Sequence, residues 1–174
     1  SEDAHLEEKL QNCLVEAFEA GLVEDATLAA SESQRAALWD LRERLPEAQK
    51  HAHADIKHDI SVPISSLASF IAEGEAAAEG VLPGIVCAPF GHFGDGNLHF
   101  NVLAAADLAD ADAKRTVHDI VARHGGSISA EHGIGQYRVD ELLRYKPQAE
   151  QEMMQWLKKA LDPAGVLNPG KVMG

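Results

Sequence analysis

Two histidines flank a glycine-rich turn in the segment 90–101, which reads FGHFGDGNLHFN. Asp95-Gly96 is a dipeptide favoured in two-residue type I′ turns, because both central residues of such a turn need a positive φ that few side chains tolerate. With that loop, His92 lies opposite His99 across a hairpin, and directly opposed Cβ atoms are about 4.5–5.5 Å apart. Two neutral imidazoles at this spacing can hold one cation, so the pattern predicts a metal site.

A catalytic zinc-type site needs a third protein ligand and an open position. Glu131 is the candidate ligand, because it lies in the glycine-flanked turn EHGIG directly after a short strand expected at 127–130. Its neighbour His132 is the candidate general base, since imidazole can accept a proton near neutral pH. Adjacent residues of a strand face opposite ways, so both serve one site only if the backbone turns, which Gly133 and Gly135 permit.

Two cations are candidates for holding an anionic substrate. Arg42 offers a planar fork that matches a carboxylate, and Lys57 projects a point charge from the polar side of a strand expected at 56–64. His58 falls on the apolar side of that strand and is expected to be a core histidine. Simpler alternatives stay open at this point: a cross-strand histidine pair without metal, a turn histidine with a satisfied hydrogen bond, and two surface cations.

The elements that must position these residues follow from periodicity, caps and glycine stops. Helices are expected at 1–21, 31–45, 65–80, 107–124, 136–145 and 148–161; strands are expected at 25–30, 56–64, 85–90, up to 103 after the hairpin, and at 127–130. Ser31 to Gln34 reads as a capping box, Pro46 ends the helix that follows, and an irregular stretch leads to residue 55. This order predicts an α+β fold, an antiparallel sheet layered with helices.

Composition narrows the function classes. The chain has 174 residues, of which 45% are hydrophobic, enough for one buried core and one domain. A formal charge of −13, from 15 basic and 28 acidic residues, argues against nucleic-acid binding, so an anionic substrate must be held by local cations. Cys13 and Cys87 form no disulfide framework, which favours a cytoplasmic location. The sequence shows no signal peptide and no membrane-spanning run.

Four motifs together resemble the C-terminal domain of FAD-linked oxidases: KHDISVP at 57–63, GHFGDGNLH at 91–99, SAEHGIG at 129–135 and DPAGVLNPGK at 162–171. This family includes D-lactate dehydrogenases, the glycolate oxidase flavoprotein subunit and D-2-hydroxyglutarate dehydrogenase. The resemblance runs from about Trp39 to the end. It implies that 1–174 is a ferredoxin-like substrate or cap domain, and that the N-terminal FAD-binding domain is absent, so the chain alone neither holds FAD firmly nor turns over.

The resemblance also implies roles for particular residues. It places a divalent metal, zinc, on His92, His99 and Glu131 and makes His132 the base. Arg42 and Lys57 would hold the substrate carboxylate, with Asn101 assisting on the metal face. The implied reaction oxidises a D-2-hydroxy acid to its 2-oxo acid with hydride transfer to FAD.

The implied partners are a D-2-hydroxy acid, an FAD-binding domain and an electron acceptor, which would be a quinone, a cytochrome or an electron-transfer flavoprotein. A homodimer and a membrane-peripheral location stay open. Some relatives that act on a dicarboxylate carry a hydroxyl side chain one helical turn after the arginine, where this chain has Pro46. The choice among glycolate, lactate and 2-hydroxyglutarate is therefore open. A metal-dependent hydrolase and a noncatalytic metal-binding module are the alternatives from other classes.

Overall fold

The computed structural model describes residues 5–52, 56–103 and 111–173, so the predicted helix start at residue 107 lies outside the described part. The chain divides into two compact units, Ser1–Pro46 and Glu47–Gly174. The first unit holds α1 (Leu6–Glu19) and α2 (Glu32–Glu43). Both predicted helices are confirmed. Gly21 follows α1 with a φ of 68°, and the Ser31 Oγ accepts the Gln34 N–H at the start of α2.

Two expectations near these helices are wrong. The predicted strand at 25–30 is not formed, because side chains take backbone donors that a ladder would need: Ala26 N–H donates to Asp25 and Ala30 N–H donates to Gln34. The stretch expected to be irregular after Pro46 contains a helix, α3 (Leu45–His51). Pro46 lies in the first turn of α3, where its missing N–H costs no intrahelical hydrogen bond, while α2 has already ended at Glu43.

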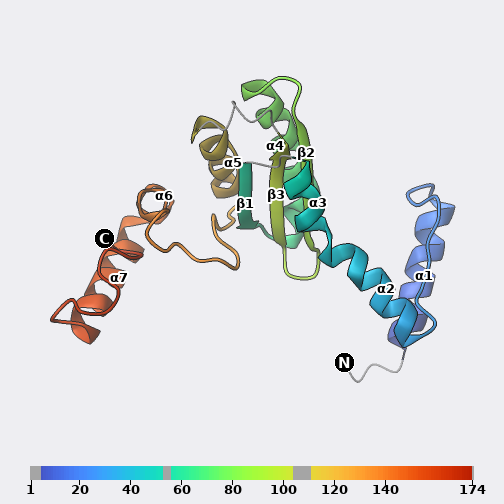
Figure 1. Ribbon diagram of the computed structural model, residues 1–174, viewed down its shortest axis with the longest axis horizontal. Helices are drawn as coiled ribbons and strands as arrows, with labels where there is room; N and C mark the ends of the chain where they lie inside the picture. The colour runs from blue at the N-terminus through green and yellow to red at the C-terminus, as the bar shows by residue number, and fades with distance from the viewer. Residues whose placement is uncertain (1–4, 53–55, 104–110, 174) are drawn as a thin grey trace. The chain divides into compact units, whose positions relative to one another are not determined.

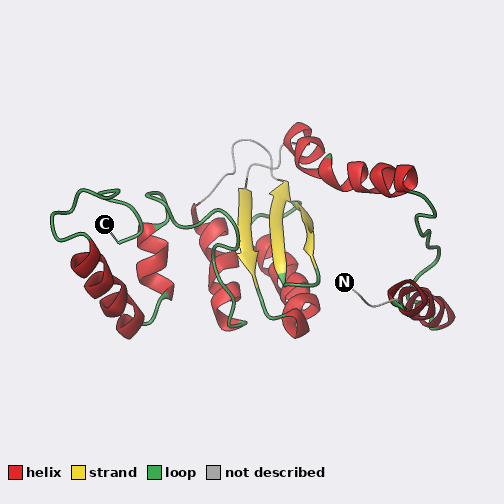
Figure 2. Cartoon of the chain, turned by 90° about the horizontal axis from the view of Figure 1, so that it is seen from below, coloured by secondary structure: helices red, strands yellow, loops and turns green. Residues whose placement is uncertain are grey.

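The second unit is built on a three-stranded antiparallel sheet of β1 (Ile56–Ser61), β2 (Val86–His92) and β3 (Asn97–Leu103), in the order β1-β3-β2. Between β1 and β2 the chain forms a short 3₁₀ helix (Ile64–Ser66) and α4 (Leu67–Val81), and after β3 it forms α5 (Ala111–Arg123). Figures 1 and 2 show α4 and α5 side by side on one face of the sheet. The predicted α+β fold is confirmed.

The predicted fourth strand at 127–130 is reduced to a single antiparallel bridge between Ser61 and Ser127. Beyond it, Ala130 N–H still donates to the Asp59 carbonyl oxygen, so the segment runs beside β1 without a full ladder. Gly126 allows this close approach, because a Cβ there would lie 2.2 Å from the Ser61 carbonyl oxygen. The segment takes the place of the last strand in a β-α-β-β-α-β arrangement, next to β1.

Alternation along the strands separates a core face from a polar face. The core lies between the sheet and α4 and α5, where the rings of Phe70 and Phe100 meet edge to face at 5.7 Å. His58 is 1% exposed within this core, as predicted for a core histidine. Its Nδ1 and Nε2 lie 2.8 and 3.2 Å from the carbonyl oxygens of Phe100 and Lys114.

The C-terminal part forms α6 (Val139–Tyr145) and α7 (Gln148–Leu161), which confirms the last two predicted helices. Leu142 of α6 is buried, and the Tyr145 hydroxyl donates to Asp119 of α5 at 2.7 Å. After α7, the carboxylate of Asp162 accepts the N–H groups of Val166 and Leu167, which closes the following turn. No helix among the described residues is long and apolar enough to cross a bilayer.

Candidate active site

The face of the sheet opposite α4 and α5 carries the polar side chains. The ladders pair Lys57 with Asn101, Asp59 with His99 and Ser61 with Asn97, and on the other side of β3 they pair Phe90 with His99. Directly paired residues of antiparallel strands lie on the same face. The chemistry-bearing residues of three strands are therefore gathered on one surface, as the sequence pattern predicted for His99 and Asn101.

The predicted hairpin register is wrong by two residues. His92 pairs with Asn97 instead of His99, and the loop is Phe93–Gly96. A type I′ turn needs positive φ at both central residues, but of Asp95 and Gly96 only the glycine has it. The Asp95 carboxylate instead accepts the Asn97 N–H at 2.9 Å, and the Gly96 carbonyl accepts the N–H of Val62 beyond β1. The longer loop is held by this contact, which hairpin statistics do not include.

The shift changes the distance between the two histidines but not their face. An offset of two residues leaves His92 and His99 on the same side, as diagonal neighbours with Cα atoms about 7–8 Å apart. His99 is largely enclosed, with 16% of its side chain exposed, and its ring lies 4.9 Å from the Phe90 ring and 6.2 Å from the His132 ring. The structure thus brings His99 toward the Glu131-His132 turn.

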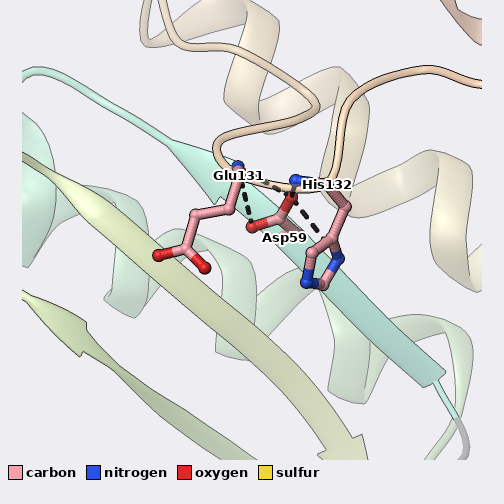
Figure 3. Close-up of side chains that lie close together, drawn as sticks. All are labelled: Asp59, Glu131 and His132. Carbon is pink, nitrogen blue, oxygen red and sulfur yellow. Dashed lines mark hydrogen bonds and ion pairs between the residues drawn. The ribbon is translucent and has the colours of Figure 1, made fainter.

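Asp59 is the centre of the arrangement, and sequence reasoning missed it. Its carboxylate is 3% exposed and accepts the N–H of Glu131 at 3.1 Å and the N–H of His132 at 2.9 Å. Figure 3 shows the Asp59 carboxylate between the Glu131 and His132 side chains. The available signal was its position on the polar side of β1, two residues from Lys57.

The charge state of Asp59 follows from two opposing effects. Burial of the carboxyl works to raise its pKa. Hydrogen bonds from the His132 and Glu131 N–H groups, with the nearby His132 and His99 imidazoles, outweigh burial and hold the pKa below its ordinary value. Asp59 is therefore an anion at neutral pH.

Two buried amides complete the polar face. Asn97 donates its Nδ2 hydrogen to Glu131, while its Oδ1 is buried and has no hydrogen-bond partner in the described structure. The Asn101 amide donates to Gln49 of α3 at 2.6 Å, and Gln49 in turn donates to the Ala88 carbonyl. Gln49 carried no sequence signal, because its segment was expected to be irregular.

Oxygen and nitrogen donors converge here in a way that fits a divalent cation. Among the described residues, ligand atoms of Asp59, Glu131 and His132 all lie within 4.8 Å of one another. The unsatisfied Asn97 Oδ1 adds an acceptor beside Glu131. Imidazole and carboxylate are donors that zinc accepts. His92 and His99 are not part of this close group, and the predicted set of His92, His99 and Glu131 stays a prediction.

The predicted anion clamp is divided between the two units. Lys57 is exposed on β1, on the same face as Asp59. Arg42 belongs to the last turn of α2, in the unit Ser1–Pro46. Lys57 therefore lies on the polar face, and the clamp stays a prediction for both residues.

The unit Glu47–Gly174 is therefore an α+β domain whose sheet has one polar face of histidine, carboxylate and amide side chains. Comparison with known proteins gives the family: the chain belongs to the FAD linked oxidases, C-terminal domain, and matches it over residues 1–172. The predicted family is confirmed.

Three relatives illustrate the match. The chain is 35% identical over 175 residues to the mitochondrial D-2-hydroxyglutarate dehydrogenase of Arabidopsis thaliana, covering 99% of this chain and 31% of the plant protein. It is 38% identical over 176 residues to the mitochondrial enzyme of Rattus norvegicus, with 99% and 32% covered. It is 36% identical over 181 residues to D-2-hydroxyglutarate dehydrogenase of Stutzerimonas stutzeri (strain A1501), with 98% and 39% covered. The chain thus spans about a third of the length of these relatives.

Proposed function

We propose that this chain is the substrate- and metal-binding domain of a flavin-dependent D-2-hydroxy-acid dehydrogenase. One observation carries the proposal: the polar face holds Asp59, His99, Glu131 and His132 together, in a chain that matches dehydrogenases over nearly its whole length. FAD would be held mainly by a separate N-terminal domain. The comparisons favour this function over a hydrolase or a noncatalytic module, because the relatives are named as dehydrogenases.

The residues have distinct tasks in this proposal. His92, His99 and Glu131 would hold a divalent metal, which would supply a Lewis acid for a substrate hydroxyl, and a bound flavin would supply the hydride acceptor. Lys57 attracts the substrate carboxylate from the same face. His132 has its Nδ1 3.6 Å from Asp59, and its side chain is 66% exposed. Its Nε2 is therefore the atom that takes the hydroxyl proton.

The substrate class is a D-2-hydroxy acid, and D-2-hydroxyglutarate is the first substrate to test because the relatives are named for it. Pro46 offers no hydroxyl for a second carboxylate, so that contact comes from another residue or the natural substrate is smaller. A cytoplasmic location stays a prediction, since the plant and rat relatives are named mitochondrial.

The experiment uses the polypeptide encoded by the complete reading frame that contains this chain. The protein is expected to be yellow when purified, and D-2-hydroxyglutarate, D-lactate or glycolate is expected to bleach the flavin under anaerobic conditions. A colourless protein, or a flavin that no D-2-hydroxy acid reduces, would contradict the proposal.

His132→Gln tests the base directly. Removing a general base is expected to lower kcat about 10²- to 10⁴-fold while the flavin stays bound. The matched control is His51→Gln, an exposed histidine of α3 to which no role is assigned. Equal turnover in the two variants would exclude His132 as the base.

A further inference from the structure

A buried carboxylate lies beneath the residues that carry the proposed chemistry. Asp59 is 3% exposed, and three hydrogen-bond donors and two imidazoles converge on its carboxylate from β3 and from the 129–132 turn. A buried anion is costly unless it is well bonded, and the bonds that compensate Asp59 come mostly from backbone N–H groups. The carboxylate is thus committed to a particular conformation of the turn.

The hydrogen bonds to Asp59 shape the backbone at Glu131 and His132. Consecutive residues of a regular strand point to opposite faces, yet these two side chains lie on either side of the same carboxylate (Figure 3). Their adjacent N–H groups both donate to Asp59, at 3.1 and 2.9 Å. Binding both donors to one anion turns the chain away from strand geometry, and Gly133, with a φ of 73°, allows the turn to continue.

The Asp59 carboxylate also lies beside the imidazoles of His99 and His132. Asp59 Oδ1 lies 3.9 Å from Nδ1 of His99, and Oδ2 lies 3.6 Å from Nδ1 of His132. An anion next to Nδ1 favours the tautomer with hydrogen on that atom. Nε2 of each ring is then left as the lone-pair donor, for a cation at His99 and for a proton at His132.

Resting on the function proposed above, we infer that Asp59 is the positioning residue of this site. It fixes the turn that presents Glu131 and His132, and it holds His99 and His132 in the Nδ1–H tautomer. It acts through these residues and not by contact with the substrate. Asparagine has nearly the same shape but puts an amide donor where the backbone N–H groups need an acceptor.

The test compares the 174-residue chain with its Asp59→Asn variant. Competition of Zn²⁺ with a chelator is expected to show about 10- to 100-fold weaker zinc binding in the variant. Amide hydrogen exchange at Glu131 and His132 is expected to accelerate. The matched control is Asp162→Asn, because Asp162 is also buried and also accepts two backbone N–H groups, but in the turn after α7. This control is expected to bind zinc like the unmodified chain.

A second measurement needs no variant and no metal. Nitrogen NMR of the zinc-free chain, at a pH where the rings are neutral, is expected to show the hydrogen of His99 and His132 on Nδ1. Hydrogen on Nε2 in both rings, or undiminished zinc affinity in folded Asp59→Asn, would overturn the role of Asp59. If the unmodified chain takes up no zinc, the metal part of the proposed function fails, while the tautomer result still decides the role of Asp59.

Discussion

His58 lies between two backbone carbonyl groups, and a neutral imidazole can donate to only one of them. Burial lowers its pKa to about 4, although the carbonyl contacts act in the opposite direction. The ring of His118 lies 5.2 Å away, and burial also lowers the pKa of that histidine. Both rings are therefore neutral in the folded protein at neutral pH.

This pair makes folding sensitive to mild acid. In the unfolded chain His58 takes up a proton near pH 6.5, but in the folded chain only near pH 4, so the unfolded state binds more protons in this window. Stability is expected to fall by about 3 kcal/mol as the pH drops from about 6.5 to about 4. Urea unfolding across this range measures the slope.

His58→Leu removes the titrating group from the core. The variant is expected to show a flatter dependence of unfolding free energy on pH, whatever its stability at neutral pH. The remaining slope comes from His118 and, below about pH 5, from carboxyl groups such as Asp59 whose pKa values are also lowered. His51→Gln is the matched control, because it removes a histidine that is exposed on α3 and not one that is buried in the core. An unchanged slope in His58→Leu would show that His58 is not the source.

The surroundings of a single residue could be predicted from the sequence where the alternation of one strand was enough to place it. The alternation of β1 placed His58 in the core, and the structure confirms it. The same alternation put Asp59 on the polar side but could not show its partners, because Glu131 and His132 are more than 70 residues further along the chain. Contacts of that sequence separation leave no local pattern.

At the scale of elements, the conformation of the β2–β3 turn requires a glycine at position 96. Local turn statistics also used this glycine, but in a shorter loop. Gly96 has a φ of 74°, and a Cβ there would lie 2.0 Å from the Val62 carbonyl oxygen. Gly96→Ala is expected to lower the free energy of unfolding by more than about 2 kcal/mol, since the left-handed conformation alone costs about 1–2 kcal/mol. Chemical denaturation measures the loss.

Gly94→Ala is the matched control within the same loop. Gly94 has no positive φ, and nothing lies within 4 Å of a Cβ built there, so its effect is expected to stay within about 0.5 kcal/mol. Similar losses in both variants would mean that the loop does not pack on Val62.

The helices, unlike this loop, could be predicted without information from distant residues, because Ser31, Gly21 and apolar periodicity are local signals.

At the scale of the whole molecule, the core belongs to one of the two units. The buried hydrophobic residues all lie between Ile56 and Leu142, and the described part of Ser1–Pro46 contains no buried residue. Removing residues 1–44 is therefore expected to change the free energy of unfolding by less than about 1 kcal/mol. Thermal and urea unfolding of the shortened chain measure this directly.

Truncation at the other end is the control. Removing residues 139–174 deletes Leu142 and the Tyr145–Asp119 hydrogen bond, so it is expected to destabilise the core clearly. Loss of cooperative unfolding after removal of residues 1–44 would show that the first unit supports the core.

The number of residues in the loop Phe93–Gly96 decides which side chains of β2 face the site. The expected and observed loops differ by two residues, and for that reason Phe90 and His92 still share a face with His99. One added residue, with no bulge to absorb it, would turn the side chains of β2 over and set Cys87 and Pro89 beside the site. An insertion of an even number of residues in this loop would therefore keep the same β2 side chains on the polar face. An insertion of an odd number would replace them with side chains that now face the core.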